Sequence, residues 1–365
     1  MKVVDIKHLV LSGGGMLGIS YIGLIKYLEE NSSIPIVKNL KSLTGCSVGA
    51  MFATFIALGY TYTELNIIVK SMIFKEYMNI NAESLINFMR LKGLESGKKL
   101  INFIKKYIND KTKNENITFR EIKEKYNIEL QIGVTNLTKS RFEMMNSTTT
   151  PDIPIHKAIS ASIAIPFVFE PVVIGEDLYC DGGLLNNLPI EIFFKYNNNE
   201  NNNENNSINT KSINKESIIQ DSNESKETNE SNETNESNET NVSKEKNVSK
   251  KKKEDEIKDS IKDSILSESI LCCYLMNCAD SINKDNYQNI SLSQYMSTVI
   301  HSISSELIKN KIKDNIVNNI NNEKQKIIIF KIPCDIMTFL KINSSHKDID
   351  NIIDISYNIT KAEFT

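Results

Sequence analysis

The sequence predicts an α/β protein built around a mainly parallel central sheet, and three observations point to this class. Short apolar runs alternate with longer segments in which apolar residues recur every three or four positions, as in strand–helix units. Two of the short runs pass straight into glycine-rich turns that open helices. Because 40% of the 365 residues are hydrophobic, the chain can also bury a sizeable core.

The first elements can be placed from the spacing of apolar residues. Residues 8–11 predict a buried strand, and 18–30 predict a helix that closes with acidic residues and asparagine. A second strand at 42–44 leads into a helix from Val48 onward. Residues 61–126 have mostly helical spacing, and we expect them to form a layer that covers the sheet.

The later elements follow the same rules. Strands are expected at 129–135, at 140–145 and, as a short pair, around 172–181. Two more are expected at 270–276 and 327–332, on either side of a long amphipathic helix near 291–320. The alternation of strands and helices therefore continues into the last third of the chain.

A change of composition at about residue 197 indicates the domain organisation. From 197 to 262 the chain has no aromatic residue, cysteine, glycine or proline, and it includes the near-repeat NESNETNESNET. Such a segment cannot bury enough apolar surface to offset the entropy lost on ordering it. We therefore expect a disordered insert at 197–262 that interrupts one domain formed by residues 5–196 and 263–365.

Charge and hydropathy exclude several classes of protein. A net charge of -3 and a pI near 6.0 give no reason to expect nucleic acid as a partner. No segment resembles a signal peptide or an uncharged membrane-spanning helix. The six scattered cysteines lack the spacing of a zinc site. We expect a cytoplasmic protein with reduced thiols that contacts membranes peripherally.

The segment GCSVG at residues 45–49 contains the first candidate for chemistry. It matches G-x-S-x-G and lies between an expected strand and an expected helix, which is the context of a nucleophile elbow. Gly45 and Gly49 leave room for a tight turn that exposes Ser47, and the positive end of the helix dipole favours negative charge beside it. Ser47 is therefore a candidate nucleophile that needs a base and an oxyanion site.

A glycine-rich turn, SGGGMLG at residues 12–18, follows the first strand and opens the first helix. Consecutive glycines can direct their N–H groups toward an oxyanion, so candidates for an oxyanion hole are Gly13, Gly14 and Gly15. The same turn also fits a dinucleotide-binding fingerprint, which needs an acidic residue about twenty positions further on. Residues 34–38 supply none.

Asp181 is the strongest candidate for the base. It ends an expected strand and is followed by Gly182 and Gly183, which bend the chain. A carboxylate beside a serine hydroxyl can accept its proton if burial raises the carboxylate pKa toward neutrality. The histidines lack a comparable local pattern, although His301 or His346 would complete a Ser-Asp-His triad in the same chain order.

Together these motifs resemble the patatin-like phospholipase family in order and spacing. The likeness spans about residues 5–196 and includes ASIAIP at 161–166 and NLP at 187–189. It implies a three-layer α/β/α fold and a hydrolase of phospholipase A type that cleaves acyl esters of membrane phospholipids or other glycerolipids, without a metal or cofactor. It also implies roles for single residues: Ser47 as nucleophile, Asp181 as general base, the backbone of Gly13, Gly14 and Gly15 as oxyanion hole, and Gly18, Gly45, Gly49, Gly182 and Gly183 as motif glycines.

The chain departs from the family pattern at Leu17, where members commonly carry arginine or lysine. Loss of that cation would affect head-group preference or rate, and it keeps open an alternative function as a catalytically weak or inactive lipid-binding relative. The acyl hydrolase hypothesis further predicts that the mouth of the site meets a bilayer. Candidate membrane contacts are Met72, Ile73 and Phe74.

Overall fold

The computed structural model describes residues 3–72, 88, 90–193, 269–277, 306–307, 327–334 and 346–365. The insert expected at 197–262 lies outside the described residues, as do Ile73, Phe74 and His301. The helix expected near 291–320 also lies outside them, apart from the helical residues 306–307. The domain boundaries expected at 196 and 263 therefore stay a prediction.

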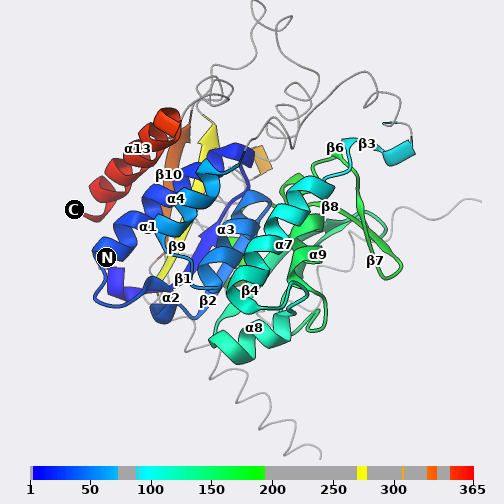
Figure 1. Ribbon diagram of the computed structural model, residues 1–365, viewed down its shortest axis with the longest axis horizontal. Helices are drawn as coiled ribbons and strands as arrows, with labels where there is room; N and C mark the ends of the chain where they lie inside the picture. The colour runs from blue at the N-terminus through cyan, green and yellow to red at the C-terminus, as the bar shows by residue number, and fades with distance from the viewer. Residues whose placement is uncertain are drawn as a thin grey trace, which may run out of the picture. The chain divides into compact units, whose positions relative to one another are not determined.

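A mainly parallel sheet lies at the centre of the described chain, with strand order β10-β9-β1-β2-β4-β8-β7 and β5 paired to β4 (Figure 1). Strands β10, β9, β1, β2 and β4 run parallel to one another, whereas β5, β7 and β8 are antiparallel to their neighbours. The bounds are β1 Ile6–Leu11, β2 Ser42–Cys46, β4 Glu129–Asn136, β5 Arg141–Met145, β7 Val172–Ile174, β8 Asp177–Asp181, β9 Ser269–Asn277 and β10 Ile327–Cys334. The predicted α/β class is confirmed, and each strand expected from the sequence is found.

Helices cover the face of this sheet that Figure 1 turns toward the viewer, where α1, α3, α7 and α8 lie in front of the strands. The helix bounds are α1 Ser20–Glu30, α2 Ile36–Asn39, α3 Val48–Ala57, α4 Tyr62–Lys70, α7 Lys98–Thr112, α8 Phe119–Tyr126, α9 Ile155–Ser162 and α13 His346–Phe364. Short 3₁₀ helices span Val3–Asp5 (η1), Gly15–Ile19 (η2), Gly182–Leu184 (η3) and Ile190–Phe193 (η4). In α3 every residue from 49 to 57 is buried, because this helix is apolar on all sides and lies over the centre of the sheet.

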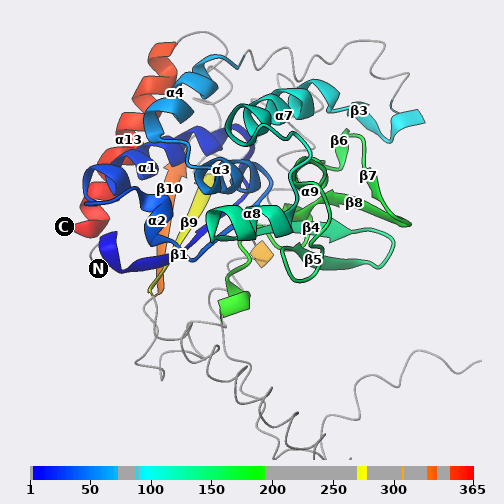
Figure 2. The same ribbon diagram turned by 60° about the horizontal axis from the view of Figure 1, so that its bottom comes forward.

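The structure adds a small two-stranded sheet and a short helix that the sequence pattern does not indicate. Strand β3 (Gly93–Glu95) pairs with β6 (Phe167–Phe169), and Figure 2 shows both beside the start of α7. Helix α9 lies between the strands expected at 140–145 and around 172–181, where the sequence pattern predicts no helix. Three-residue strands and an eight-residue helix are too short for apolar spacing to distinguish them from loops.

Helix α13 is also not predicted by the sequence, and the residues of its buried face explain why. The buried residues are spaced by three or four positions, but two of them are polar: Ile349, Ile353, Ser356 and Thr360. The Ser356 hydroxyl donates to the Ser20 carbonyl oxygen of α1. A Cβ at Gly23 of α1 would lie 2.3 Å from the Ile353 carbonyl oxygen, so glycine permits this close helix contact.

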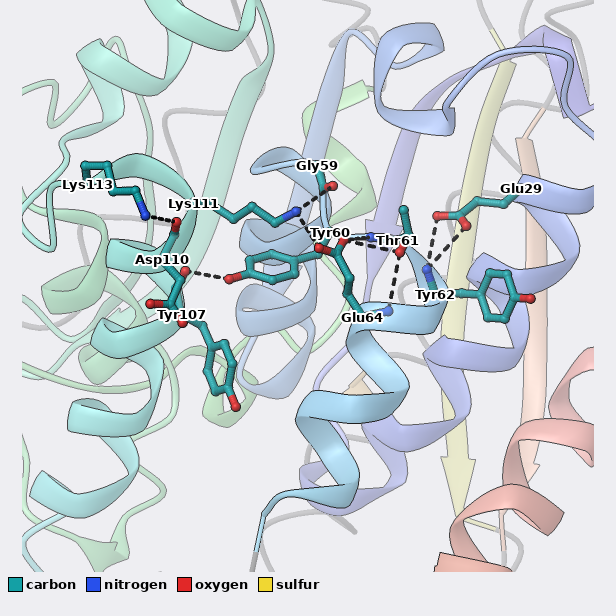
Figure 3. Close-up of polar contacts among 10 residues, drawn as sticks. All are labelled: Glu29, Gly59, Tyr60, Thr61, Tyr62, Glu64, Tyr107, Asp110, Lys111 and Lys113. Carbon is teal, nitrogen blue, oxygen red and sulfur yellow. Dashed lines mark hydrogen bonds and ion pairs between the residues drawn. The ribbon is translucent and has the colours of Figure 1, made fainter.

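A polar cluster joins the start of α4 to α7 (Figure 3). The Lys111 ammonium on α7 lies 2.7 Å from Glu64 Oε1 and 4.4 Å from the centroid of the Tyr60 ring. The Tyr60 hydroxyl donates to the Tyr107 carbonyl oxygen of α7 at 2.7 Å. Glu64 and Thr61 also form the capping box that begins α4. The groups that cap α4 and the ion pair between α4 and α7 therefore belong to the same cluster.

Candidate active site

Ser47 is the single residue between β2 and α3. Its φ is 53° and its ψ is -128°, a backbone conformation that non-glycine residues rarely adopt. A Cβ at Gly45 would lie 2.3 Å from the Gly49 carbonyl oxygen, and one at Gly49 would lie 2.3 Å from the Leu11 carbonyl oxygen. Only glycines at these positions let α3 begin so close to β1 and β2, and this close start forms the strained elbow.

The register of the sheet brings Asp181 to the level of Ser47. Cys46 at the end of β2 pairs with Gly133 of β4, and the next residue of β4, Val134, pairs with Asp181 at the end of β8. Strand β4 therefore lies between the two candidate residues and sets their height along the sheet. The antiparallel direction of β8 matters, because it makes the strand end at this level and release the chain into the Gly182 turn.

The two side chains are in direct contact. Ser47 Oγ donates to Asp181 Oδ2 at 2.6 Å, and the two residues are only 6% and 5% exposed. Asp181 Oδ1 accepts the Gly183 N–H at 2.7 Å. Burial raises the pKa of Asp181 to about 7, although the hydrogen bonds from Ser47 and Gly183 act in the opposite direction. A carboxylate with this pKa can exchange a proton near neutral pH.

Ser162 supports the elbow from behind, a contact that the sequence does not reveal. The backbone N–H of Ser47 donates to Ser162 Oγ at 2.8 Å, and Ser162 Oγ donates to the Gly133 carbonyl oxygen at 2.7 Å. Ser162 is fully buried at the end of α9. The Ser162 hydroxyl therefore connects Ser47 to β4, the strand that lies between Ser47 and Asp181. The only signal in the sequence is the family resemblance of the ASIAIP stretch, which does not indicate a contact.

The glycine-rich turn lies against Ser47 and is held by Asn187. A Cβ at Gly13 would be 2.9 Å from Ser47 Cβ, so the turn and the elbow are adjacent. The Gly13 N–H donates to the Asn187 carbonyl oxygen at 3.2 Å, and Asn187 Nδ2 donates to the Gly13 carbonyl oxygen at 3.1 Å. The Gly13 N–H is therefore already hydrogen-bonded, whereas the sequence motif predicts that it is available to an oxyanion. The N–H groups of Gly14 and Gly15 have no acceptor among the described residues.

The remaining motif glycines also lie at close contacts. A Cβ would come within 3.0 Å of neighbouring atoms at Gly14, Gly18, Gly182 and Gly183. Leu17 is 8% exposed and belongs to the main hydrophobic core beneath the turn. The apolar residue at the position of the family cation is therefore accommodated by packing.

An apolar cavity of about 120 Å³ opens beside Ser47. Among its described lining residues, Ser47 has the one polar side chain. The wall includes side chains from several elements, such as Met16 of η2, Met51 and Phe52 of α3, Leu100 of α7, and Ile165, Phe169 and Met72. Such a lining suits a hydrocarbon chain with its reacting group at the serine.

The alternatives left open by the sequence can be compared with this geometry. Neither Ser47 nor Asp181 contacts a described histidine: His156 Nε2 lies 3.0 Å from Asn116 Oδ1, and His346 is an exposed residue that begins α13. A dinucleotide fingerprint needs a second strand that ends in an acidic side chain, but here β2 ends at the Ser47 elbow.

The two cysteines that directly precede Ser47 and Asp181 in the sequence are not competing nucleophiles. Cys46 and Cys180 are buried free thiols. Burial raises the pKa of Cys180 to about 12, and it also raises the pKa of Cys46 well above its usual value. Both thiols therefore stay protonated at neutral pH.

The described part of the chain contains neither a candidate metal-binding cluster nor a candidate membrane-spanning helix. Within it, no group of three or more His, Cys, Asp or Glu side chains is arranged to hold a metal ion. No helix in the same residues is long and apolar enough to cross a membrane.

The fold and this constellation define an α/β protein with a buried serine elbow. Comparison with known families then identifies the chain: a family model for patatin-like phospholipase matches residues 9–194, about half of its length. The chain therefore belongs to the patatin-like phospholipase family, and the resemblance seen in the sequence motifs is confirmed.

The chain is also similar to individual proteins. An uncharacterised protein of Acanthamoeba polyphaga mimivirus is 35% identical over 189 residues, which cover 52% of this chain and 62% of that protein. A probable lipid hydrolase of Invertebrate iridescent virus 6 is 30% identical over 197 residues, covering 53% of this chain and 66% of that protein. The matches thus span less than two thirds of either relative.

Among solved structures, VipD from Legionella pneumophila aligns over 98% of this chain and 66% of its own length, with 16% identity and a TM-score of 0.42. A TM-score this low does not equate two folds. The family assignment rests on the sequence match.

Proposed function

We propose that this chain is a lipid acyl hydrolase of phospholipase A type that uses Ser47 as nucleophile and Asp181 as general base. The observation that carries the proposal is the 2.6 Å hydrogen bond from Ser47 Oγ to Asp181 Oδ2, with Ser47 lining an apolar cavity. A serine on a strained elbow, with a buried carboxylate as its direct acceptor, has the arrangement needed for nucleophilic catalysis.

The proposed reaction begins with attack of Ser47 Oγ on the ester carbonyl carbon. As the C–O bond forms, the hydroxyl proton passes to Asp181 Oδ2, whose raised pKa makes it a competent acceptor near pH 7. The carbonyl oxygen becomes an oxyanion, and the N–H groups of Gly14 and Gly15 are the donors proposed to stabilise it. This assignment omits Gly13, because its amide already donates to Asn187.

Collapse of the tetrahedral intermediate breaks the ester C–O bond. The leaving alcohol takes the proton from Asp181, and the acyl group remains on Ser47 as an ester. Water then attacks this acyl-enzyme while Asp181 accepts its proton, and the fatty acid leaves as the Ser47 hydroxyl is restored. Each step uses one proton shuttled through a single carboxyl group, so no histidine is needed.

The proposed substrate class is acyl esters of membrane phospholipids or other glycerolipids. The apolar wall of the cavity supports this choice, since a hydrocarbon chain would bury its surface there while its ester group reaches Ser47. Access to such substrates calls for peripheral contact with a bilayer, and we place the protein in the cytoplasm.

The direct test is release of free fatty acid from mixed phospholipid vesicles by the wild-type protein, Ser47→Ala and Asp181→Asn, each shown to be folded to the same extent. We expect release by the wild type and none by either variant. Release that persists in Ser47→Ala would overturn the assignment of the nucleophile. Absence of release in all three, across pH and lipid classes, would favour the alternative of an inactive lipid-binding relative.

A further inference from the structure

A tight turn at residues 165–168 holds an aromatic residue in an unfavourable position. The Val168 N–H donates to the Ile165 carbonyl oxygen at 3.1 Å, Pro166 is the second residue, and Phe167, the third, has a φ of 68°. These are the features of a type II turn, whose third position requires a positive φ and favours glycine. A bulky residue with this backbone conformation is a true steric outlier.

Burial within the described chain does not offset this strain. The Phe167 side chain is 51% exposed. Its ring contacts that of Phe88, with centroids 6.4 Å apart. An aromatic residue that is both strained and exposed indicates an interaction beyond the described residues, because strained residues persist where they serve an interaction.

The turn is anchored beside the cavity of the candidate active site. Ile165 and Phe169, which flank the tip, both line that cavity together with Ser47. The Phe169 N–H donates to the Ile165 carbonyl oxygen at 2.9 Å, and the pairing of β6 with β3 holds the second half of the turn. Phe167 is therefore fixed within two residues of the cavity wall on either side.

Positive charge gathers next to the same turn. Gly97, just before α7, approaches the Phe169 ring, since its Cβ would lie 3.5 Å from Phe169 Cδ1. The first two residues of α7 are the exposed Lys98 and Lys99, and its first turn contains no acidic residue. Lysines there oppose the helix dipole, so helix stability does not account for them. Two carboxylates lie nearby, Glu95 and Glu170, and the Glu170 N–H donates to the Glu95 carbonyl oxygen at 2.9 Å. Burial raises the pKa of Glu95, and Lys99 acts against that rise.

We propose that Phe167, together with Lys98 and Lys99 at the start of α7, docks the protein onto an anionic phospholipid bilayer and presents the Ser47 cavity to it. Entry of the ring into the boundary between head groups and acyl chains would bury its exposed apolar surface, while the lysines would be attracted to anionic head groups. The inference rests on the proposed acyl hydrolase function for its purpose, but bilayer binding can be measured without turnover.

The absence of tryptophan from the sequence allows a specific probe. In a Ser47→Ala background, Phe167→Trp introduces a single indole at the proposed point of insertion. We expect its emission to shift to the blue and to be quenched by brominated lipid when phosphatidylglycerol-containing vesicles are added, and to change less with pure phosphatidylcholine vesicles.

A matched control is Ile34→Trp in the same background. Ile34 is 46% exposed and precedes β2, whereas Ser47 follows the end of that strand. The control therefore lies toward the amino-terminal end of β2, and the active site lies at its carboxyl-terminal end. Emission from Ile34→Trp should not change with vesicles. An unchanged emission from Phe167→Trp, or an equal change in both variants, would overturn the proposal.

Phe167→Gly separates docking from folding. Glycine relaxes the turn, so the thermal midpoint should rise or stay equal, whereas partition onto anionic vesicles should fall on the order of tenfold. Hydrolysis of a water-soluble short-chain ester should not change. Vesicle partition that equals the wild type would overturn the proposal, and a lower midpoint would assign Phe167 a structural role instead.

The lysines are tested by Lys98→Gln combined with Lys99→Gln. Binding to anionic vesicles should fall by roughly fivefold or more and lose much of its salt dependence, since each lysine near the membrane surface contributes to attraction. Lys125→Gln is the control, because Lys125 is exposed near the end of α8 before β4 begins. Equal losses in both variants would contradict a localised docking surface. If docking persists while the wild type hydrolyses neither vesicles nor soluble esters, only the proposed hydrolase function fails.

Discussion

Two hydroxyl–carboxylate pairs in this protein share their chemistry and differ in their electrostatics. In the candidate active site, Ser47 Oγ donates to Asp181 at 2.6 Å; at the start of α4, Thr61 Oγ1 donates to Glu64 at 3.2 Å (Figure 3). Burial raises the pKa of Asp181 to about 7. Burial also acts to raise the pKa of Glu64, but hydrogen bonds from Lys111 and Thr61 outweigh it and lower that pKa.

The surroundings of each pair account for the difference. Asp181 is 5% exposed, and no cationic side chain among the described residues forms an ion pair with it. The Glu64 side chain is 41% exposed and lies 2.7 Å from the Lys111 ammonium. A carboxylate buried without a cation becomes a base near neutral pH, whereas one held by a lysine stays ionised and serves as a structural anchor.

The largest expected effect is on hydrolysis when either member of the buried pair is replaced. Ser47→Ala or Asp181→Asn should lower kcat/KM for a soluble ester by at least about 10⁴-fold, as happens when serine hydrolases lose a reacting group. Thr61→Ala removes the equivalent hydroxyl of the exposed pair and should change kcat/KM by less than about twofold. A similar loss in all three variants would mean that the pairs do not differ in function.

The second effect concerns pH. In the proposed mechanism Asp181 must be ionised to accept the Ser47 proton, and burial raises its pKa to about 7. The value of kcat/KM should therefore rise about tenfold from pH 5 to 6 and about fivefold from pH 6 to 7, and level off above about pH 8. The measurement uses a soluble ester, so that vesicle binding does not contribute. A rate that is constant from pH 5 to 8 would contradict a base with this raised pKa.

A smaller effect is expected at Ser162, which supports the buried pair without joining it. Ser162→Ala leaves the Ser47 N–H without its buried acceptor, which should lower the free energy of unfolding by about 1–3 kcal/mol. We also expect kcat to fall by about tenfold while KM changes little, because the elbow is displaced and the cavity is not.

Ser160→Ala is the matched control for Ser162. The Ser160 hydroxyl donates to the His156 carbonyl oxygen within α9, so its loss leaves Ser47 untouched. The control should leave kcat unchanged. It should alter the free energy of unfolding by about 0.5 kcal/mol or less. If both variants lose the same stability and keep full kcat, Ser162 contributes to helix packing only.

The smallest effect is expected at the exposed cluster. Lys111→Met removes the ion pair with Glu64 and the contact with the Tyr60 ring, which together should contribute about 1 kcal/mol or less to the free energy of unfolding. Hydrolysis should not change. Chemical denaturation of wild type and variant at low and high salt measures the effect, and most of the difference should disappear at high salt. A large loss of kcat would link this cluster to the active site.

Local signals made much of the fold predictable. Strand β2, the G-x-S-x-G elbow and α3 are contiguous in sequence, and each is specified by its own residues. Helix α13 escaped prediction because Ser356 and Thr360 occupy half of its buried face, where apolar spacing cannot reveal them. The same limit applies to Phe167, since its unusual backbone depends on a turn whose geometry no spacing rule describes.

The sequence by itself determined which residues were candidates: a serine on an elbow, a glycine-rich turn and an aspartate before two glycines, all recognisable because tight turns restrict residue type. Only the tertiary structure decided what these residues do to one another. The pairing of Cys46 with Gly133 and of Val134 with Asp181 sets the Ser47–Asp181 contact, and Asn187 engages the Gly13 amide. Burial, which raises the pKa of Asp181, is a property of the packed chain because it arises from neighbours distant in sequence.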